Sequence, residues 1–239
     1  GLFCLILFPL TVIPTLVAVP DKVAERSEAL GWQDMAGLLR SNPILWRLLT
    51  ADFTTSFAVS ATAALYIFFA TYAFELQNHA SLALLLYFVA GFLAMPAWLK
   101  LAYRMGKVGA IKLAMGYTMV LQSGLFFVTE PGNVVLFWSY PFLAGLAFGA
   151  TPTLLHSMMA DLTDIDELKT GQKRAGMYFA LLATINKLGG AVAVGVTLTA
   201  ADKLFNFTPG AANSQAAIDG LLLIFCFAPA AALAMTYLP

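Results

Sequence analysis

Charged side chains are scarce in this sequence. Asp, Glu, Lys and Arg make up only 11% of its 239 residues, whereas 60% are hydrophobic. A soluble domain usually carries about 25% charged residues, so this chain has too few to cover a surface in water. The scarcity excludes an ordinary water-soluble protein and indicates that a lipid bilayer is the solvent. Basic and acidic residues are equal in number, 13 of each, so no net charge favours binding to nucleic acid.

Cysteine is almost absent as well. Cys4 and Cys226 both lie inside apolar runs, which argues against a disulfide framework or a metal site and favours buried thiols. The sequence also lacks a Ser/His/Asp arrangement, a phosphate-binding loop and a dinucleotide glycine motif, so we expect neither an enzyme nor a cofactor. Its first residues are apolar, without the basic segment and cleavage site of a signal peptide. We interpret the chain as a fragment that starts inside or just before a membrane helix.

Long hydrophobic runs dominate what is present. A membrane-spanning helix needs about 20 largely apolar residues, and these runs are too long and too irregular in alternation for strands. Because lipid offers no hydrogen-bond partners, backbone groups there must bond within a helix. The sequence therefore predicts an all-α, polytopic membrane helical bundle. The predicted spans are Leu2–Val19, Leu48–Phe74, Ala80–Leu99, Val108–Val128, Val134–Met158, Gly176–Ala200 and Gly220–Leu238.

Lysine and arginine orient these spans. Most of them fall in or beside three connecting regions, which share one side of the membrane if the chain alternates sides at each span. The opposite connections hold only Lys203. Basic loops are typical of the cytoplasmic side, so we predict a plasma or inner cell membrane protein with cytoplasmic segments 20–47 and 159–175. The basic residues on that side are Lys22, Arg26, Arg40, Arg47, Lys100, Arg104, Lys107, Lys112, Lys169, Lys173 and Arg174.

The connection after the first span is longer and more polar than the others. Near its end, Asn42 and Pro43 are typical of a helix start, as N-cap and first helical residue. The sequence therefore predicts a transmembrane helix over 1–19, a cytoplasmic central linker over 20–47 and a six-helix transmembrane domain over 48–239.

Ionisable residues inside spans are costly and usually functional. Asp52 and Lys112 are predicted within about one turn of a span end, where a side chain can reach water. Lys187 lies eleven residues into its predicted span, about 16 Å deep and near the midplane. We expect no carboxylate of another span at this depth. His156, near a cytoplasmic end, is interpreted as a hydrogen-bonded structural residue, with a proton relay as the alternative.

Small and polar residues share the helix face of Lys187, whereas bulkier residues lie on the other face and are expected to contact lipid. We predict that Lys187, with Thr184 one turn before it, contacts a substrate or takes part in ion coupling. A static ion pair with a carboxylate is the alternative. Gly189 fits neither face. The first face carries Gly176, Ala180, Ala183, Thr184, Gly190, Ala191 and Val194, and the second carries Leu181, Leu182, Ile185, Val192 and Val196.

Prolines and glycines gather in one predicted span. Pro141, Gly145, Gly149 and Pro152 lie within Val134–Met158. Proline can loosen a membrane helix for gating, although membrane helices also tolerate it without function. A mobile hinge and a static kink are both consistent with this pattern.

The most specific motif follows that span. Residues 158–179 read MMADLTDIDELKTGQKRAGMYF. This stretch closely resembles the cytoplasmic loop between helices ten and eleven of the glycoside–pentoside–hexuronide:cation symporters, the melibiose-permease-like branch of the major facilitator superfamily. Pro96-Ala97-Trp98 followed by Arg104-Met105-Gly106-Lys107 is similar to the loop between helices eight and nine of that family. The residues that match the first motif are Asp161, Asp164, Asp166, Glu167, Lys169, Thr170, Gly171, Arg174 and Gly176.

The resemblance implies a fold and a function. It identifies the chain as helices six to twelve of a twelve-helix transporter, that is, one helix plus the C-terminal six-helix half, with the missing N-terminal half as its partner. It implies cation-coupled symport of a sugar or sugar-like small-molecule solute. Lys187 matches a helix-eleven lysine that such symporters need for transport. The coupling ion would be Na⁺ or H⁺, and its site would lie mainly on helices two and four, in the missing half.

The resemblance also suggests a cytoplasmic gate. Ion pairs from the acidic loop to the other half would hold the gate shut and break when it opens. A plain soluble turn is the alternative interpretation of these charges. The predicted gate residues are Asp161, Asp164, Asp166, Glu167, Arg174 and Arg104.

Two other functions stay open at this point. One is a lipid or lysolipid carrier of the same superfamily, which a broad apolar pathway would favour. The other is a non-transporting membrane assembly factor, since a fold does not fix a function.

Overall fold

The computed structural model describes residues 2–18, 37–39 and 42–237. All regular structure in these residues is helical, and no strand occurs among them, which confirms the all-α prediction. The chain divides into two compact units, Gly1–Gly37 and Leu38–Pro239. Most of the predicted linker 20–47 lies outside the described residues.

The first unit contains helix α1, Leu2–Ala18. Its bounds agree with the first predicted span to within one residue. With 17 residues and two internal prolines, Pro9 and Pro14, it is about 25 Å long and lies at the lower limit of length for crossing a bilayer.

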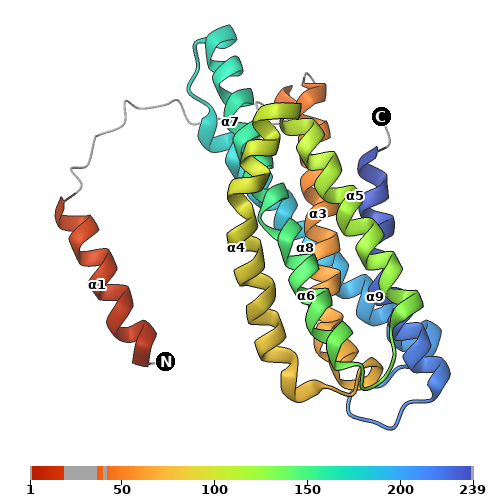
Figure 1. Ribbon diagram of the computed structural model, residues 1–239. Helices are drawn as coiled ribbons and strands as arrows, with labels where there is room; N and C mark the ends of the chain where they lie inside the picture. Colours follow the sequence, from red (N-terminus) through yellow and green to blue (C-terminus); the bar gives the residue numbers. More distant parts are fainter. Residues whose placement is uncertain (1, 19–36, 40–41, 238–239) are drawn as a thin grey trace. The chain divides into compact units, whose positions relative to one another are not determined.

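The second unit contains six helical segments that are long and apolar enough to cross a membrane, as predicted for this part of the chain. Figure 1 shows them running alternately in opposite directions. The segments are α3 (Pro43–Phe68) continued by the π-helical turn η1 (Phe69–Ala73), the 3₁₀ turn η2 (Gln77–His79) with α4 (Ala80–Met105), α5 (Lys107–Val128), α6 (Val134–Phe148) with α7 (Ala150–Thr170), α8 (Ala175–Phe205), and α9 (Gln215–Ala234) with the 3₁₀ turn η3 (Met235–Tyr237).

The first of these segments starts as the sequence predicts. The Asn42 side chain accepts hydrogen bonds from the backbone amides of Ile44 and Leu45, at 3.1 and 3.2 Å, and Pro43 is the first helical residue. Because α3 begins before the apolar run does, Asp52 lies about 14 Å from the start of the helix. The prediction that Asp52 lies one turn from a span end is therefore wrong. Lys112, in contrast, lies near the start of α5 and is exposed.

Most of the predicted loop 159–175 is helical. Helix α7 continues to Thr170 and ends at Gly171, which adopts a left-handed conformation with φ 70°. The helix persists because Met159, Leu162 and Thr163 form a buried face beneath the charges. The last turns of α7 project past the neighbouring helices at the end of the bundle where α4 ends and α5 and α8 begin (Figure 1). We call this the basic end, because it carries nearly all of the lysines and arginines of the second unit.

The span formed by α6 and α7 is interrupted at Gly149. Pro152, three residues later, has no backbone N–H, so it cannot bond the carbonyl of Phe148 one turn earlier. The interruption lies among the residues for which the sequence left a kink and a hinge open. Whether the interruption acts as a mobile hinge stays a prediction.

Two glycines allow close contact between helices. Helix α8 packs most extensively against α3, and α4 packs extensively against α6. A Cβ atom at Gly189 of α8 would lie 2.6 Å from the carbonyl oxygen of Phe53, and one at Gly145 of α6 would overlap the carbonyl of Tyr87. Gly189, which fits neither predicted face of α8, is therefore explained by its contact with α3.

Aromatic rings fill the core near the end opposite the basic end. Phe69 of η1 stacks on Phe225 of α9 with ring centroids 4.0 Å apart, and Tyr140 meets both rings edge-on. Cys226 is buried in the same cluster as a free thiol, as predicted. The side chain of Cys4 lies outside the described residues.

Candidate functional site

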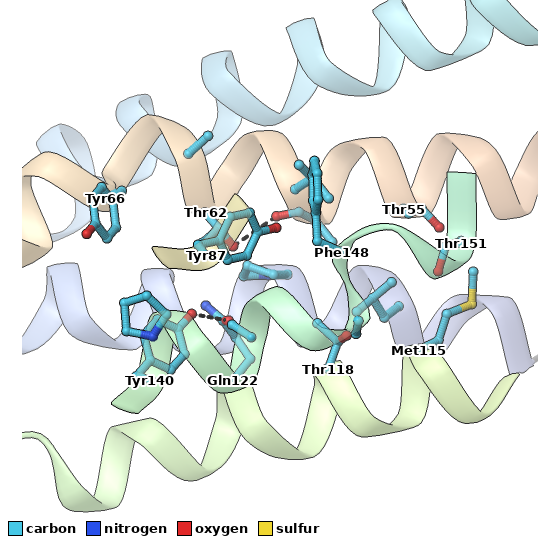
Figure 2. A pocket seen from close by; sticks show the side chains of 18 of the residues that line it. Thr55, Thr62, Tyr66, Tyr87, Met115, Thr118, Gln122, Tyr140, Phe148 and Thr151 are labelled. Atoms are coloured by element: carbon cyan, nitrogen blue, oxygen red, sulfur yellow. Dashed lines mark hydrogen bonds between the residues drawn. The ribbon is translucent and has the colours of Figure 1, made fainter. Parts of the chain in front are cut away.

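A cavity of about 180 Å³ lies among the helices of the second unit. Figure 2 shows that side chains from several helices point into it. The lining residues are Thr55, Ala58, Val59, Thr62, Ala63 and Tyr66 of α3; Leu84, Tyr87 and Phe88 of α4; Met115, Thr118 and Gln122 of α5; Tyr140, Pro141, Ala144, Ala147, Phe148, Thr151 and Pro152 of α6 and α7; and Pro229 and Leu233 of α9.

The cavity combines aromatic rings with hydroxyl groups. None of the described residues that line it is charged. The hydroxyls of Thr62 and Thr118 donate to the carbonyls of Ala58 and Ala114, at 3.0 and 2.9 Å. Since these protons are already used, the hydroxyl oxygens can accept hydrogen bonds from a ligand. The cavity therefore suits a neutral molecule with hydrogen-bond donors and an apolar face.

One side of the cavity is fixed by a buried polar network. Gln122 donates from Nε2 to the carbonyl of Phe225 at 2.7 Å, and the Tyr140 hydroxyl donates to Oε1 of Gln122 at 2.6 Å. Each group satisfies the next, which makes a buried network rigid. Gln122 was not predicted, because solute-contacting side chains in the spans were sought only among ionisable residues and on the helix face of Lys187. A polar amide in the middle of Val108–Val128 was the available signal.

The predicted hinge residues divide between the cavity and the packing around it. Pro141 and Pro152 line the cavity. Gly145 and Gly149 instead face α4, and a Cβ atom at Gly149 would lie 3.1 Å from Cε of Met95. A change in the α6–α7 interruption would therefore alter both the cavity wall and the contact with α4.

Lys187 and Thr184 do not line this cavity. Both side chains are exposed on α8, and Lys187 forms no ion pair with another described residue. Thr184 donates to the carbonyl of Ala180 at 2.8 Å. Their proposed contact with a solute or coupling ion stays a prediction.

The predicted division of α8 into two faces is partly wrong. Leu181 and Leu182, which were expected to contact lipid, are buried in the second unit, whereas Val192 and Val196 are exposed. Small residues occur on both faces of this helix, so they did not distinguish the packed face from the open one. The residues buried in α8 are Tyr178, Leu181, Leu182, Gly189, Ala193, Thr197 and Ala201.

A carboxylate does lie beside the middle of α8, contrary to prediction. Asn186, the residue before Lys187, donates from Nδ2 to Oδ1 of Asp52 at 3.3 Å. The Asp52 side chain is buried, with 3% of the residue exposed. Ser56, one turn later on α3, donates to the backbone carbonyl of Asn186 at 2.5 Å. Asp52 was missed because its predicted membrane span began with the apolar run at Leu48, five residues after the helix itself begins at Pro43.

Two predicted gate acids form ion pairs within the second unit. Nζ of Lys107 lies 2.5 Å from Oδ2 of Asp161, and Nε of Arg174 lies 3.2 Å from Oδ2 of Asp166. The second pair is the more enclosed, with side-chain exposures of 15% and 13%. The remaining predicted gate residues, Asp164, Glu167 and Arg104, are exposed and form no ion pair with another described residue.

His156 is hydrogen-bonded through one ring nitrogen. Its Nδ1 lies 2.8 Å from the carbonyl of Pro152, and since a carbonyl only accepts, Nδ1 must carry the proton. The exposed ring also stacks on Phe179. This geometry agrees with the structural interpretation of His156 and leaves Nε2 available for another role. Among the described residues, no group of three or more His, Cys, Asp and Glu side chains is arranged to hold a metal ion.

The sequence matches a known family over its full length. The sequence model of a family described as MFS/sugar transport protein matches residues 1–239. A symporter from Synechocystis sp., sll1374, described as uncharacterized, is 33% identical over 106 residues, which are 43% of this chain and 19% of that protein. The sphingosine-1-phosphate transporter MFSD2B from Xenopus tropicalis is 24% identical over 152 residues, which are 63% of this chain and 29% of that protein. The matched regions thus cover less than a third of either relative.

Proposed function

The chain belongs to the MFS/sugar transport protein family, and from this membership we propose that it is part of a secondary active transporter for a sugar or sugar-like solute. The family and the six membrane-capable helices make it a multi-pass membrane protein. Transport would be driven by Na⁺ or H⁺ and would occur by alternating access, in which two halves rock around a solute near the bilayer midplane. The basic end would face the cytoplasm.

The observation that carries this proposal is the chemistry of the cavity. Sugar rings have an apolar face that packs on aromatic side chains and hydroxyls that exchange hydrogen bonds. Tyr66, Tyr87 and Tyr140 supply rings, and Thr62 and Thr118 supply acceptor oxygens. We infer that this cavity is the part of the solute site contributed by the second unit.

Lys187 and the charges at the basic end have separate roles in this proposal. Lys187, exposed on α8, would contact the solute or respond to the coupling ion from across the interface with the other half. Exposed Asp164, Glu167 and Arg104 would form the ion pairs of a cytoplasmic gate. The internal pair of Asp166 and Arg174 would hold α7 against the start of α8 while that gate opens and closes.

A specific observation favours a second candidate, an amphiphile such as a lysolipid. Much of the cavity wall is apolar, including Phe88, Phe148 and Leu84, and one relative is described as a sphingosine-1-phosphate transporter. An anionic headgroup needs a cation or several donors, and no charged residue lines this cavity in the described part of the chain. The headgroup would then have to reach Lys187 or the other half.

The test is uptake into liposomes that contain the full-length protein. Labelled mono- and disaccharides and a labelled lysophospholipid are offered under imposed Na⁺ or proton gradients. We expect saturable, gradient-dependent uptake of a sugar that unlabelled sugar inhibits and lysolipid does not. The reverse pattern would establish the amphiphile carrier. No flux of either class, together with a stable protein partner, would favour the assembly factor and contradict the proposal.

A matched pair of variants connects uptake to the cavity. Thr62→Val removes a cavity hydroxyl and keeps the shape of the side chain, and we expect about a threefold to tenfold weaker apparent affinity for the sugar. Thr50→Val is the control, because Thr50 is exposed and makes the same kind of hydrogen bond, to the carbonyl of Trp46 at 2.9 Å. Equal effects of the two substitutions would argue against this cavity as the solute site.

A further inference from the structure

Asp52 is a buried carboxyl in the second unit with an incomplete set of hydrogen bonds. It lies about 14 Å from the start of α3, and only 3% of the residue is exposed. Its Oδ1 accepts one long hydrogen bond, 3.3 Å, from Nδ2 of Asn186. Its Oδ2 is buried and has no hydrogen-bond partner among the described residues.

This environment does not suit a carboxylate ion. Burying an unpaired charge costs several kcal/mol, even after the protein relaxes around it. A single long amide hydrogen bond offsets little of that cost, and no lysine or arginine forms an ion pair with Asp52 among the described residues. A protonated carboxyl carries no charge, so burial penalises it far less. The arrangement therefore favours the acid form.

Few charged groups surround the site. From α7, which packs against α3, the ionisable residue one turn after Pro152 is His156, whose ring is exposed. From α8, the neighbour is the uncharged amide of Asn186, and the adjacent Lys187 is exposed. The charged residue of α9, Asp219, lies near the other end of the bundle, and η1 and η3 each carry one tyrosine as their titratable group, Tyr72 and Tyr237. On α3 itself, Arg47 is exposed.

His156 lies on α7, which packs against α3. Its Nδ1 donates to the carbonyl of Pro152 at 2.8 Å. The ring is exposed, whereas Asp52 is buried.

We propose that Asp52 is a proton-binding site, occupied while its carboxyl is buried in the contact between α3 and α8 and emptied when water reaches that contact. On release, the carboxyl O–H bond breaks and the proton moves to a water molecule, and binding is the reverse. The contact between α3 and α8 is tight in this structure. Ser56 donates to the backbone carbonyl of Asn186 at 2.5 Å, and Gly189 closely approaches Phe53. The inference rests on the proposed transport function for its role in coupling, and it assigns a proton site to this part of the chain.

The proton itself is the probe in the first test. Infrared spectra of the full-length protein are recorded from about pH 5 to about pH 8, for the wild type and for Asp52→Asn. We expect the wild type to show the C=O band of a protonated carboxyl that Asp52→Asn lacks. Asp219→Asn, on α9 and outside the site, is the control and should keep the band. Identical carboxyl bands in the wild type and Asp52→Asn at every pH would overturn the proposal.

A second variant, Asn186→Leu, tests the site even if Asp52→Asn does not fold. Asn186→Leu keeps Asp52 but removes the hydrogen bond that favours its ionised form. The carboxyl band should then persist to higher pH than in the wild type. A band that disappears at the same pH as in the wild type would count against the site.

The transport readout separates this inference from the proposed function. In liposomes, Asp52→Asn should retain exchange of labelled sugar at equal pH but lose the acceleration by an acidic outside medium. Unchanged acceleration in Asp52→Asn would contradict the role of Asp52 in coupling. If the wild type moves no sugar or lysolipid at all, the proposed function fails, whereas the infrared band still decides whether Asp52 binds a proton.

Discussion

Asp52 and Lys187 lie at similar depth on two helices that pack against each other, yet their surroundings are opposite. Asp52 is buried and bonded to Asn186, whereas Lys187, one residue further along α8, is exposed and forms no ion pair among the described residues. Ionisable residues are expensive inside a membrane. The two helices therefore carry one ionisable group enclosed within the six-helix unit and one directed out of it.

The two positions respond to different events. A buried acid can respond only when the contact between α3 and α8 changes. An exposed lysine can respond to whatever lies across the open face of α8, whether solute, ion or the other half of the transporter. We infer that Asp52 on α3 binds a proton inside the unit, whereas Lys187 on α8 contacts a group outside it.

The largest expected effect comes from removing the exposed charge. Lys187→Ala in the full-length protein should abolish gradient-driven accumulation of sugar and leave expression intact, because no buried contact is lost. Accumulation in liposomes is the measurement. Lys203→Ala is the control, since Lys203 is exposed at the other end of α8 and pairs with Asp202. Normal accumulation of sugar in Lys187→Ala would contradict the proposed role of this lysine.

A smaller effect is expected from disturbing the contact that encloses Asp52. Gly189→Ala would place a methyl group 2.6 Å from the carbonyl of Phe53 and should destabilise the protein by about 1–3 kcal/mol. Gly195→Ala is a matched control on the same helix, because nothing lies within 4 Å of its Cβ position. Unfolding experiments in detergent measure the stability of both variants. Equal stability of the two variants would contradict the close packing of α8 on α3.

The smallest effect is expected from the internal ion pair at the basic end. Arg174→Gln leaves Asp166, which is largely enclosed, without its partner, and should cost about 1 kcal/mol of stability and slow uptake moderately. Lys203→Gln breaks a pair whose side chains are 75% and 56% exposed, and should change stability by less than about 1 kcal/mol. A larger loss of stability in Lys203→Gln than in Arg174→Gln would contradict the greater contribution expected of the enclosed ion pair.

Much of the fold follows from local sequence signals. Asn42 and Pro43 start α3, Gly171 ends α7, and the Pro152 region interrupts its span, because each residue constrains the backbone directly. The apolar runs predict the six membrane-capable helices, because backbone groups in lipid must bond within a helix. These signals act within a few residues, so a single sequence is sufficient to interpret them.

The packed side of α8 and the burial of Asp52 could not be predicted in this way. The outward direction of Lys187 and the inward direction of Leu182 depend on where α3 lies, which is tertiary information. The helix of Asp52 begins outside its apolar run, so hydropathy alone placed the carboxyl too close to water. The cavity could not be predicted, because residues of several helices line it. The hydrogen bonds of Gln122 join residues that no regular sequence spacing relates.

We propose that the face of α8 with Lys187 lies on an aqueous solute route and not against lipid. The direct measurement is labelling of Lys187→Cys by a water-soluble maleimide, in full-length protein whose other cysteines are replaced. Leu182→Cys, at a buried position, is the control. We predict that Lys187→Cys is labelled, that transported sugar slows the labelling, and that Leu182→Cys stays unlabelled. An unreactive Lys187→Cys, or labelling that no solute affects, would contradict the account.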